Sequence, residues 1–397
     1  MLKRYRLRNY NFILLALVLT ASVFGLVLIN SADPSYTLRQ GLGIAAAAVW
    51  MIFLSFVDYN KLLKHYKLCY IIAIVLLALV LVVGRTAMGA QRWIPLGPIN
   101  LQPSEIAKIL LVIFLAARLT RNRVRIDTWR FILTTALILI IPLALLVSEP
   151  DLSQTILTAI ILFIVFFCGG LPYKKLGIIL AVIVPVVIIL LIYVQNPDQK
   201  LLKPYQWYRV MSFLDPENFD DSVYQQRNAV TAIGSGGLSG KGLNNDDPTS
   251  LLNSELIPEA HTDFVFAALG EQLGFAGSMC AIGLLAAIVT VCIIIAVRTK
   301  DYAGRLVVIG VAAHVGMQTV LNIGVVTRLL PNTGLALPFF SYGISALFAL
   351  YTAMGVVLNI ALQREPYREK DLYTKDFVDV KSFRDDRGRY RKRISQR

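Results

Sequence analysis

The chain alternates long apolar runs with short polar segments. A hydrocarbon core of about 30 Å is crossed by about 20 apolar helical residues. Several runs reach this length, most clearly 12–30, 39–57, 277–297 and 340–363. We predict ten spans in all, at approximately residues 12–30, 39–57, 68–83, 105–117, 131–147, 152–168, 176–194, 263–297, 306–325 and 340–363. The pattern predicts an all-α polytopic membrane protein with about ten transmembrane helices and a large extracellular loop before the eighth. The eighth run is too long for one simple span, so we expect part of it to tilt or to lie at the surface.

Composition supports the same class. The 397 residues are 56% hydrophobic and 16% charged, which leaves no visible soluble domain of ordinary size. The N-terminal "MLKRYRLRNY" precedes an apolar run, as in a signal peptide, but no A-x-A pattern follows and further spans come soon after. An uncleaved first helix is therefore expected. The four cysteines lie in apolar stretches at unrelated spacings, typical of small packing residues.

The distribution of basic residues predicts an orientation. With the N-terminus inside, 29 of the 39 Lys and Arg lie in cytoplasmic segments, nine lie outside, and Lys108 lies within a span. This bias places both termini in the cytoplasm. The net charge of +14 therefore implies membrane topology and no nucleic acid. The spans make one domain, 1–363, and the basic segment 364–397 is expected to be a mobile cytoplasmic tail near anionic lipid.

The longest outer connection, about 195–262, is polar and contains nine carboxylates. Its Gly-rich stretch, "AIGSGGLSGKG" (232–242), lacks the G-x-x-x-x-G-K-[ST] pattern of a phosphate-binding loop, because Gly242 follows Lys241. A flexible or tightly turning loop is the favoured interpretation.

Ionisable residues crowd together where this loop meets the eighth run. Glu255, Glu259, His261 and Asp263 fall within nine residues. Asp263 is expected to begin a helix, where capping of free N–H groups is one explanation for it. A carboxylate at membrane depth costs about 2.5–3.5 kcal/mol on insertion scales, so it usually has a partner or a function.

Three further polar stretches map to the outer side. Residues 84–108 are Gly- and Pro-rich and predict a re-entrant or interfacial segment leading into a short helix begun by Pro103. Glu105 and Lys108, three residues apart, share a face of that helix, as a buried ion pair or as part of a site. Arg92 and Trp93 fit an interfacial anchor.

The other two stretches are 148–154 and 327–343. Glu149 and Asp151 in the first are interpreted as ordinary loop carboxylates, and the second is Gly- and Pro-rich with one cation. The three histidines are too scattered in sequence to predict a zinc site.

Six segments together resemble one family of membrane proteins. They are "RWIPLGPINLQPSEIAK", "EPDLSQ", "YQWYRVMSFLDP", "AIGSGGLSGKG", "PEAHTDFVFAALGEQLG" and "NIGVVTRLLPNTGLALPFFSYG". In this order they resemble the SEDS family over nearly the whole chain, and the last segment resembles the elongation branch, RodA, more than the FtsW or SpoVE branches. One departure is "SYGISALF", where members usually have "SYGGSS".

The resemblance implies a peptidoglycan glycosyltransferase that polymerises lipid II outside the cytoplasmic membrane of a bacterium. The family's essential aspartate falls on Asp263, an important acidic residue on Glu255, and its transmembrane Glu and Lys on Glu105 and Lys108. The implied partners are lipid II, the nascent lipid-linked glycan, a class B penicillin-binding protein and other elongation-complex proteins. A lipid II flippase and a non-catalytic scaffold are the alternatives.

The chemistry of such a reaction matches the residue types. An α-linked sugar diphosphate becomes a β-linked polymer, so one in-line displacement needs one general base, which we assign to Asp263. The leaving diphosphate needs positive charge from Lys108, Arg92 or Arg209, or from a divalent cation (Mg or Mn) held by Glu255 and Asp263. Glu259, His261 and Trp93 are further candidates for substrate binding or for tuning the site.

Overall fold

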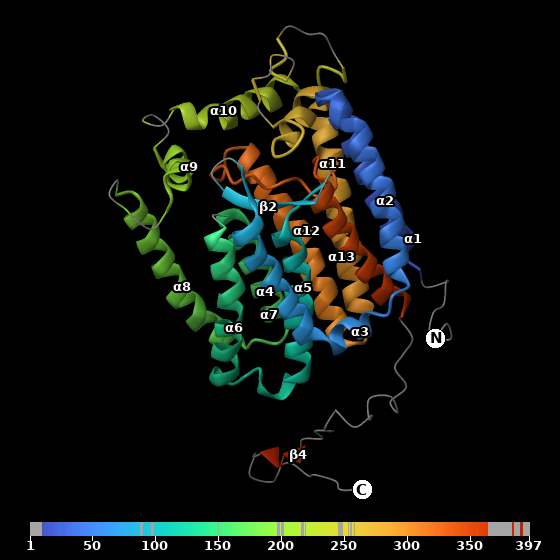
Figure 1. Ribbon diagram of the computed structural model, residues 1–397, viewed down its shortest axis with the longest axis vertical. Coiled ribbons are helices and arrows are strands. Elements are labelled where there is room, and N and C mark those ends of the chain that lie inside the picture. Colours follow the sequence, from blue (N-terminus) through green and yellow to red (C-terminus); the bar gives the residue numbers. More distant parts are fainter. Residues whose placement is uncertain are drawn as a thin grey trace.

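The computed structural model describes most of the chain. The described residues are 10–87, 90–96, 99–149, 151–196, 199, 202–215, 218, 220–244, 249–252, 254, 256–257, 259–363, 383–384 and 390–391. Within them, ten long helices form a bundle (Figure 1). They are α1 Phe12–Ala32, α2 Thr37–Ser55, α4 Tyr66–Val83, α5 Pro103–Arg121, α6 Trp129–Ser148, α7 Leu152–Cys168, α8 Tyr173–Val194, α11 Val265–Arg298, α12 Tyr302–Val326 and α13 Ile344–Leu362.

Each of these helices coincides with a predicted run. In the described chain, eight helices are long and apolar enough to cross a membrane, and α7 is a shorter apolar helix. The remaining long helix, α5, carries Glu105, Lys108, Arg118 and Arg121 in a largely apolar sequence. It is 19 residues long, whereas a short helix was predicted. The expected polytopic all-α fold is confirmed.

Polar residues just before the apolar runs set where several helices begin. The Asn11 side chain accepts a hydrogen bond from Leu14 N (2.9 Å) at the start of α1. The Asp301 side chain accepts from Gly304 N (2.7 Å) at the start of α12. Such caps satisfy backbone donors that have no partner within the helix.

The helices differ in how deeply they are buried. Most side chains of α5, α12 and α13 are buried, so these helices make the centre of the bundle. In α8 only Val194 is buried, and Figure 1 shows this helix apart from the others. Its aliphatic surface is therefore suited to lipid.

The predicted polar loop before α11 contains two helices, α9 (Pro204–Leu214) and α10 (Asp220–Ser235). The indole Nε1 of Trp207 on α9 donates to Val194 O at the end of α8 (2.8 Å). Neither helix was predicted, because α9 is short and amphipathic and α10 is polar. A further short helix, α3 (Tyr59–Lys64), joins α2 to α4.

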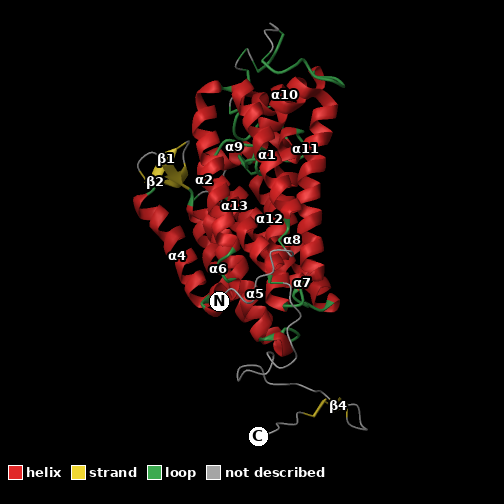
Figure 2. Cartoon of the chain, turned by 90° about the vertical axis from the view of Figure 1, so that its right-hand side faces the viewer, coloured by secondary structure: helices red, strands yellow, loops and turns green. Residues whose placement is uncertain are grey.

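The segment predicted as re-entrant or interfacial forms three strands, which were not predicted. β1 (Arg85–Ala87), β2 (Ala90–Leu96) and β3 (Ile99–Leu101) make an antiparallel sheet in the order β1-β2-β3. Figure 2 shows the strands at one side of the bundle, toward the end that carries α9 and α10. Only two short strands are described in the tail, β4 (Phe383–Arg384) and β5 (Tyr390–Arg391), which pair antiparallel.

The long eighth run contains a break. Gly274 has φ 63° and ψ −159°, so α11 is two helical pieces joined at a kink. The Gly-rich loop packs on this kink, where Phe275 N donates to Gly237 O and Lys241 N to Glu271 O (both 2.9 Å). A Cβ on Gly240 would lie 2.1 Å from Gln272 O, so glycine is required there. Of the two interpretations of this loop, the tight turn is confirmed.

Near the start of α13, Ile344 departs from "SYGGSS" and Ser345 keeps its serine. The side chain of Ile344 packs against α2, since a Cβ built on Gly43 would lie 3.5 Å from its Cγ1. Ser345 Oγ accepts a hydrogen bond from Gln102 N (2.8 Å) and ties α13 to the start of α5. A large apolar residue is therefore accommodated beside a polar one that keeps a structural bond.

The cysteines divide into two pairs. Cys69 and Cys292 are buried among other side chains, as predicted, whereas Cys168 and Cys280 are exposed on the bundle surface. The packing interpretation is wrong for the second pair.

Candidate functional site

Asp263 lies in the turn that precedes α11. The N-cap position belongs to Phe264, and no side chain caps the helix there, so the expectation that Asp263 begins and caps the helix is wrong. The backbone is held instead by Asn322 of α12, whose Nδ2 donates to Asp263 O (2.8 Å) and to Leu335 O (2.6 Å). One amide side chain therefore fixes the Asp263 turn and the 327–343 loop together.

The surroundings of Asp263 make its carboxyl a weaker acid than that of an ordinary aspartate. Burial raises the pKa of its carboxyl to about 6, and the negative charge of Glu259 adds to this, whereas Arg209 and Arg92 act in the opposite direction. Desolvation disfavours the charged form, and nearby cations favour it. At neutral pH the group is mostly ionised, with a pKa suited to accepting a proton.

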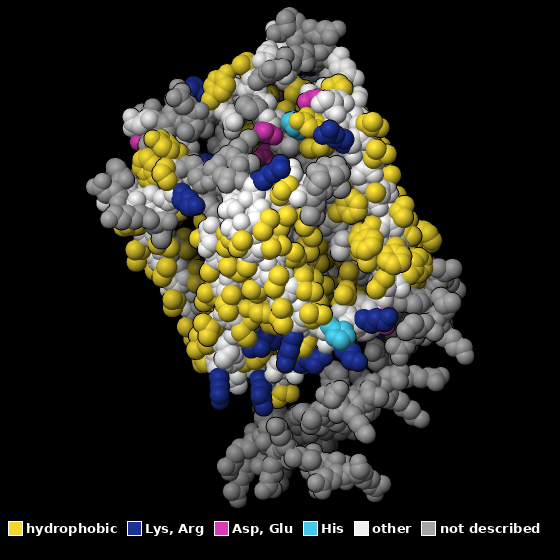
Figure 3. Space-filling view, viewed as in Figure 1, with side chains coloured by type: hydrophobic (Ala, Val, Ile, Leu, Met, Phe, Trp, Pro, Cys, Tyr) yellow, Lys and Arg dark blue, Asp and Glu magenta, His cyan; other side chains and the backbone are white. Residues whose placement is uncertain are grey.

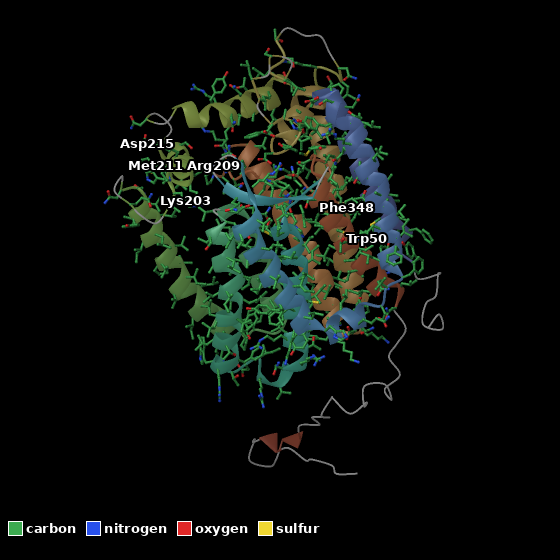
Figure 4. All side chains as sticks on the ribbon, viewed as in Figure 1. Trp50, Lys203, Arg209, Met211, Asp215 and Phe348 are labelled. Carbon is green, nitrogen blue, oxygen red and sulfur yellow. The ribbon has the colours of Figure 1, made fainter. Side chains whose placement is uncertain are left out.

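Gly334 forms part of the wall beside Asp263. It has φ +69°, and a Cβ built there would lie 3.0 Å from Asp263 Oδ2 and 3.7 Å from Arg209 Nη1. Arg209 comes from α9 and is labelled in Figure 4. Carboxylate and guanidinium thus flank one glycine, and any larger residue would be strained and crowded. Gln318 Nε2 holds the same loop through Ala336 O (2.8 Å).

An aromatic group lies beside the turn. The His261 ring stacks on Tyr36 with centroids 4.4 Å apart, and Tyr342 lies 4.6 Å from Tyr36. The Glu259 carboxylate accepts from Thr262 Oγ1 (2.7 Å) and lies 4.0 Å from His261 Nε2. The backbone of Glu259 has φ 58°, and its carbonyl accepts from two later N–H groups of the turn. The turn is consequently built by its own polar side chains.

Arg92 and two carboxylates form a third group. Arg92 Nε on β2 lies 3.3 Å from Asp151 Oδ2, and Asp151 Oδ1 caps α7 through Gln154 N (3.2 Å). Asp151 is 2% exposed and Glu149 is 0% exposed. The interpretation of these two as ordinary loop carboxylates is therefore wrong.

Glu105 and Lys108 form a buried pair. Lys108 Nζ lies 2.9 Å from Glu105 Oε2 and donates to Gln154 Oε1 (2.8 Å), while Gln154 Nε2 donates to Glu105 Oε1 (2.7 Å). His314 of α12 adds its Nε2 at 3.8 Å from Glu105 Oε2. The Lys108 and Glu105 side chains are 1% and 2% exposed, so the ammonium does not reach the surface.

The structure brings only some of the predicted site residues around Asp263. Glu259, Arg209 and Arg92 act on its charge, and Glu255 lies outside the described residues. Trp93 follows Arg92 on a strand and so points to the opposite face of the sheet. Its role stays a prediction.

Several residues at the site were not predicted from the sequence. Asn322, Gln318 and Gly334 were part of apolar or loop segments, and only folding brings them to Asp263. Asn322, Gln318 and His314 are spaced four residues apart on α12, a spacing that marks one polar face and could have identified them.

The described residues contain no group of three or more His, Cys, Asp or Glu that could hold a metal ion. They therefore do not by themselves make the carboxylate set that a divalent cation prefers. Glu255, the second predicted ligand beside Asp263, lies outside the described residues.

The chain is a bundle of apolar helices with a group of carboxylates and arginines at one end. This is the arrangement of a polytopic membrane protein whose ionisable groups lie outside its apolar core. Residues 6–366 match the sequence model of the FtsW, RodA and SpoVE family, described as cell cycle proteins. The chain belongs to this family.

Relatives and solved structures agree with that assignment. A probable peptidoglycan glycosyltransferase FtsW of Trichlorobacter lovleyi is 33% identical over 390 residues, covering 93% of this chain and 98% of the relative. That of Aliivibrio salmonicida is 33% identical, covering 89% and 88%. A chain in a structure of a peptidoglycan synthase complex that coordinates polymerization and crosslinking aligns with TM-score 0.75 and 31% identity, covering 89% of this chain and 98% of that one. The rod shape determining protein RodA of Thermus thermophilus aligns with TM-score 0.65 and 30% identity, covering 90% and 98%.

Proposed function

We propose that this protein is a peptidoglycan glycosyltransferase that polymerises lipid II into β-1,4-linked glycan on the outer face of the cytoplasmic membrane. The observation that carries the proposal is Asp263, a carboxylate with a pKa of about 6 under the influence of Arg209 and Arg92. Family membership and the peptidoglycan glycosyltransferase names of the relatives support it.

In the proposed reaction, the 4-hydroxyl of one lipid-linked sugar attacks the anomeric carbon of another. Asp263 accepts the hydroxyl proton as the C–O bond forms, and the bond to the lipid diphosphate breaks with inversion. Arg209 and Arg92 stabilise the charge that develops on the leaving diphosphate. No second carboxylate is needed, because no covalent sugar intermediate forms.

The outer position of the site is part of the proposal and is supported by charge. Figure 3 shows Lys and Arg gathered at the lower end of the apolar belt, opposite the end with exposed acidic side chains. Tyr10 stacks on Phe56, and Asn359 Oδ1 accepts from Tyr59 N (3.0 Å), so α1 begins and α13 ends near α3. A positive inner end would put the Asp263 turn on the outer side, which supports the proposed position of the site.

Single cysteines test this orientation. Ser235→Cys at the exposed end of α10 should react with an impermeant thiol reagent from outside, and Ser395→Cys in the tail should not. Both are compared in a background without the four native cysteines. The reverse labelling would move the site to the cytoplasm and remove the proposed access to outer-leaflet substrate.

The decisive test of the activity is purified protein incubated with labelled lipid II. Glycan polymer is expected from the wild type and not from Asp263→Asn. Movement of lipid II across vesicles without polymer would support a flippase, and neither activity would support a scaffold. The Glu105, Lys108 and His314 group is sealed in the bundle, which argues against a polar path for the whole headgroup.

We further propose a class B penicillin-binding protein as the stable partner, together with other proteins of the elongation complex. The solved complex that coordinates polymerization and crosslinking contains a chain of this fold, which supports it. Such a partner would dock its transmembrane helix by close packing on the bundle surface. Unchanged polymerisation on addition of every co-expressed transpeptidase would contradict the partnership.

The cellular role is proposed to be elongation and cell shape. The 322–343 segment and the similarity to a RodA structure support it, whereas the FtsW names of the curated relatives make division the alternative. Depletion should give round cells if the protein elongates the wall, and long unseptated cells if it divides them. A divalent cation held by Asp263 and Glu255 also stays a proposal, tested by the metal dependence of polymerisation and by metal binding to Glu255→Gln.

A further inference from the structure

Glu149 is the most unusual acidic residue of the described chain. It is 0% exposed, and neither carboxylate oxygen has a hydrogen-bond partner among the described residues. Leaving a buried carboxylate ionised without a partner costs several kcal/mol, and the group usually takes up a proton instead. Glu149 follows the last residue of α6, and Asp151 acts both on its charge and on that of Asp263, so the three carboxylates lie at the same end of the bundle.

The charges around Glu149 are few and identifiable. Asp151 is the negative neighbour and Arg92 the positive one. Arg92 Nε lies 3.3 Å from Asp151 Oδ2. The charges of Lys108 and Glu105 on α5 also act on the pKa of Asp151. Two carboxylates that share a single arginine in a buried site do not both ionise readily.

The same arginine also acts on the catalytic site. Arg92 and Asp151 both influence the charge of Asp263, together with Glu259 and Arg209. The state of the pair formed by Glu149 and Asp151 thus changes how much of the positive charge of Arg92 is available to Asp263 and to an approaching diphosphate. When the pair holds one proton, it carries one negative charge beside Arg92. When that proton is lost, the pair carries two negative charges.

We propose that Glu149 is a positioning residue that keeps a proton during turnover, so that the positive charge of Arg92 acts on the Asp263 site as well as on Asp151. This inference rests on the proposed glycosyltransferase function and adds a residue to it. Loss of the proton would draw Arg92 toward the pair and weaken its stabilisation of the leaving diphosphate. Burial, with Asp151 beside it, raises the pKa of Glu149 to about 8, in keeping with this role.

The first test needs no activity. Infrared difference spectra of the purified protein in lipid nanodiscs should show a neutral carboxyl carbonyl band at pH 7 that is lost as pH rises through about 8. The band should be missing in Glu149→Gln. Asp151→Asn should shift its loss to lower pH, because Arg92 then pairs with Glu149. Absence of a Glu149 band at pH 7 would overturn the proposal even if the enzyme polymerises normally.

The second test is the alkaline side of the pH–rate profile, with each variant normalised to its own maximum. With a pKa of about 8 the wild-type rate should fall by about tenfold between pH 7 and pH 9. Glu149→Gln should lose this limb, and Asp127→Asn, a control at an exposed carboxylate on the opposite end, should keep it. A limb that persists in Glu149→Gln would reject the proposal. Absence of polymer from every protein, with the infrared band present, would reject the proposed function instead.

Discussion

The two charged clusters of this protein use similar residue types and differ in how their charges are matched. In the Glu105 cluster, Lys108 and Gln154 contact the carboxylate at 2.7–2.9 Å, and the three come from two adjacent helices. In the Asp263 site, acids and arginines come from a turn, a strand and an amphipathic helix, and the pKa of Asp263 is raised. A matched pair in rigid helices holds the bundle together, whereas an unmatched carboxylate on a turn is ready to take a proton.

The largest expected effect comes from removing the proton acceptor of the unmatched site. Asp263→Asn keeps the size of the side chain and cannot act as a base, so polymerisation should fall by about 10²–10⁴-fold. Folding should change little, because Asp263 does not cap α11 and Asn322 bonds only its backbone. Polymer yield and lengths from lipid II measure it, with Glu259→Gln as a control expected to be milder. Near-normal polymer from Asp263→Asn would remove this residue from the mechanism.

Breaking the matched cluster should act on folding instead. Lys108→Met leaves Glu105 buried and uncompensated, which typically destabilises a protein by about 3–5 kcal/mol. Folded protein in membranes, measured by fluorescence-detected size-exclusion chromatography, should fall.

Lys175→Met is the matched control, since its partner Asp127 is 77% exposed and such pairs contribute less than about 1 kcal/mol. The sequence favoured a role for Lys108 in diphosphate binding, and its 1% exposure favours the structural role. Normal accumulation of Lys108→Met with poor polymerisation would restore the first interpretation.

Asn322 tests whether the Asp263 turn must be held in place. Asn322→Leu removes the donor to Asp263 O and Leu335 O, and a misplacement of about 1 Å can reduce a rate by about 10²-fold. We expect a loss in turnover larger than the loss in folded protein. Thr319→Val, on the same helix and bonded only to Val315 O of its own helix, should have little effect. Equal losses in both measurements would make Asn322 a folding residue only.

The smallest effect is the acid limb of the pH profile. With a pKa of about 6 for Asp263, the rate should fall about tenfold per pH unit below that value. The raised pKa also means that the folded state holds this proton more tightly than the unfolded chain. Stability from this group is therefore highest below the unfolded value of 3.8 and declines as pH rises to about 6. An acid limb well below pH 6 would indicate a different base.

Much of the fold could be predicted from the hydrophobic pattern of single segments. Runs such as 12–30 and 176–194 became α1 and α8, because a membrane span must satisfy its backbone hydrogen bonds within itself. The excess length of the eighth run predicted that it is not one simple span, and the kink at Gly274, which was not predicted, divides it. The strands at 85–101 and the helices α9 and α10 were not predicted, because the strands and α9 are short and α10 is polar.

The sequence by itself determined the class of protein, the order of its spans, the charge asymmetry and the identity of the acidic turn around Asp263. These depend on hydrophobicity, spacing and residue type, which are properties of short segments. Only the tertiary structure decided which charges interact. It pairs Lys108 with Glu105 and Gln154, brings Arg209 and Arg92 near enough to lower the pKa of Asp263, and buries Glu149. The strength of a charge interaction depends on distance and on the exclusion of water, and both are set by segments far apart in the chain.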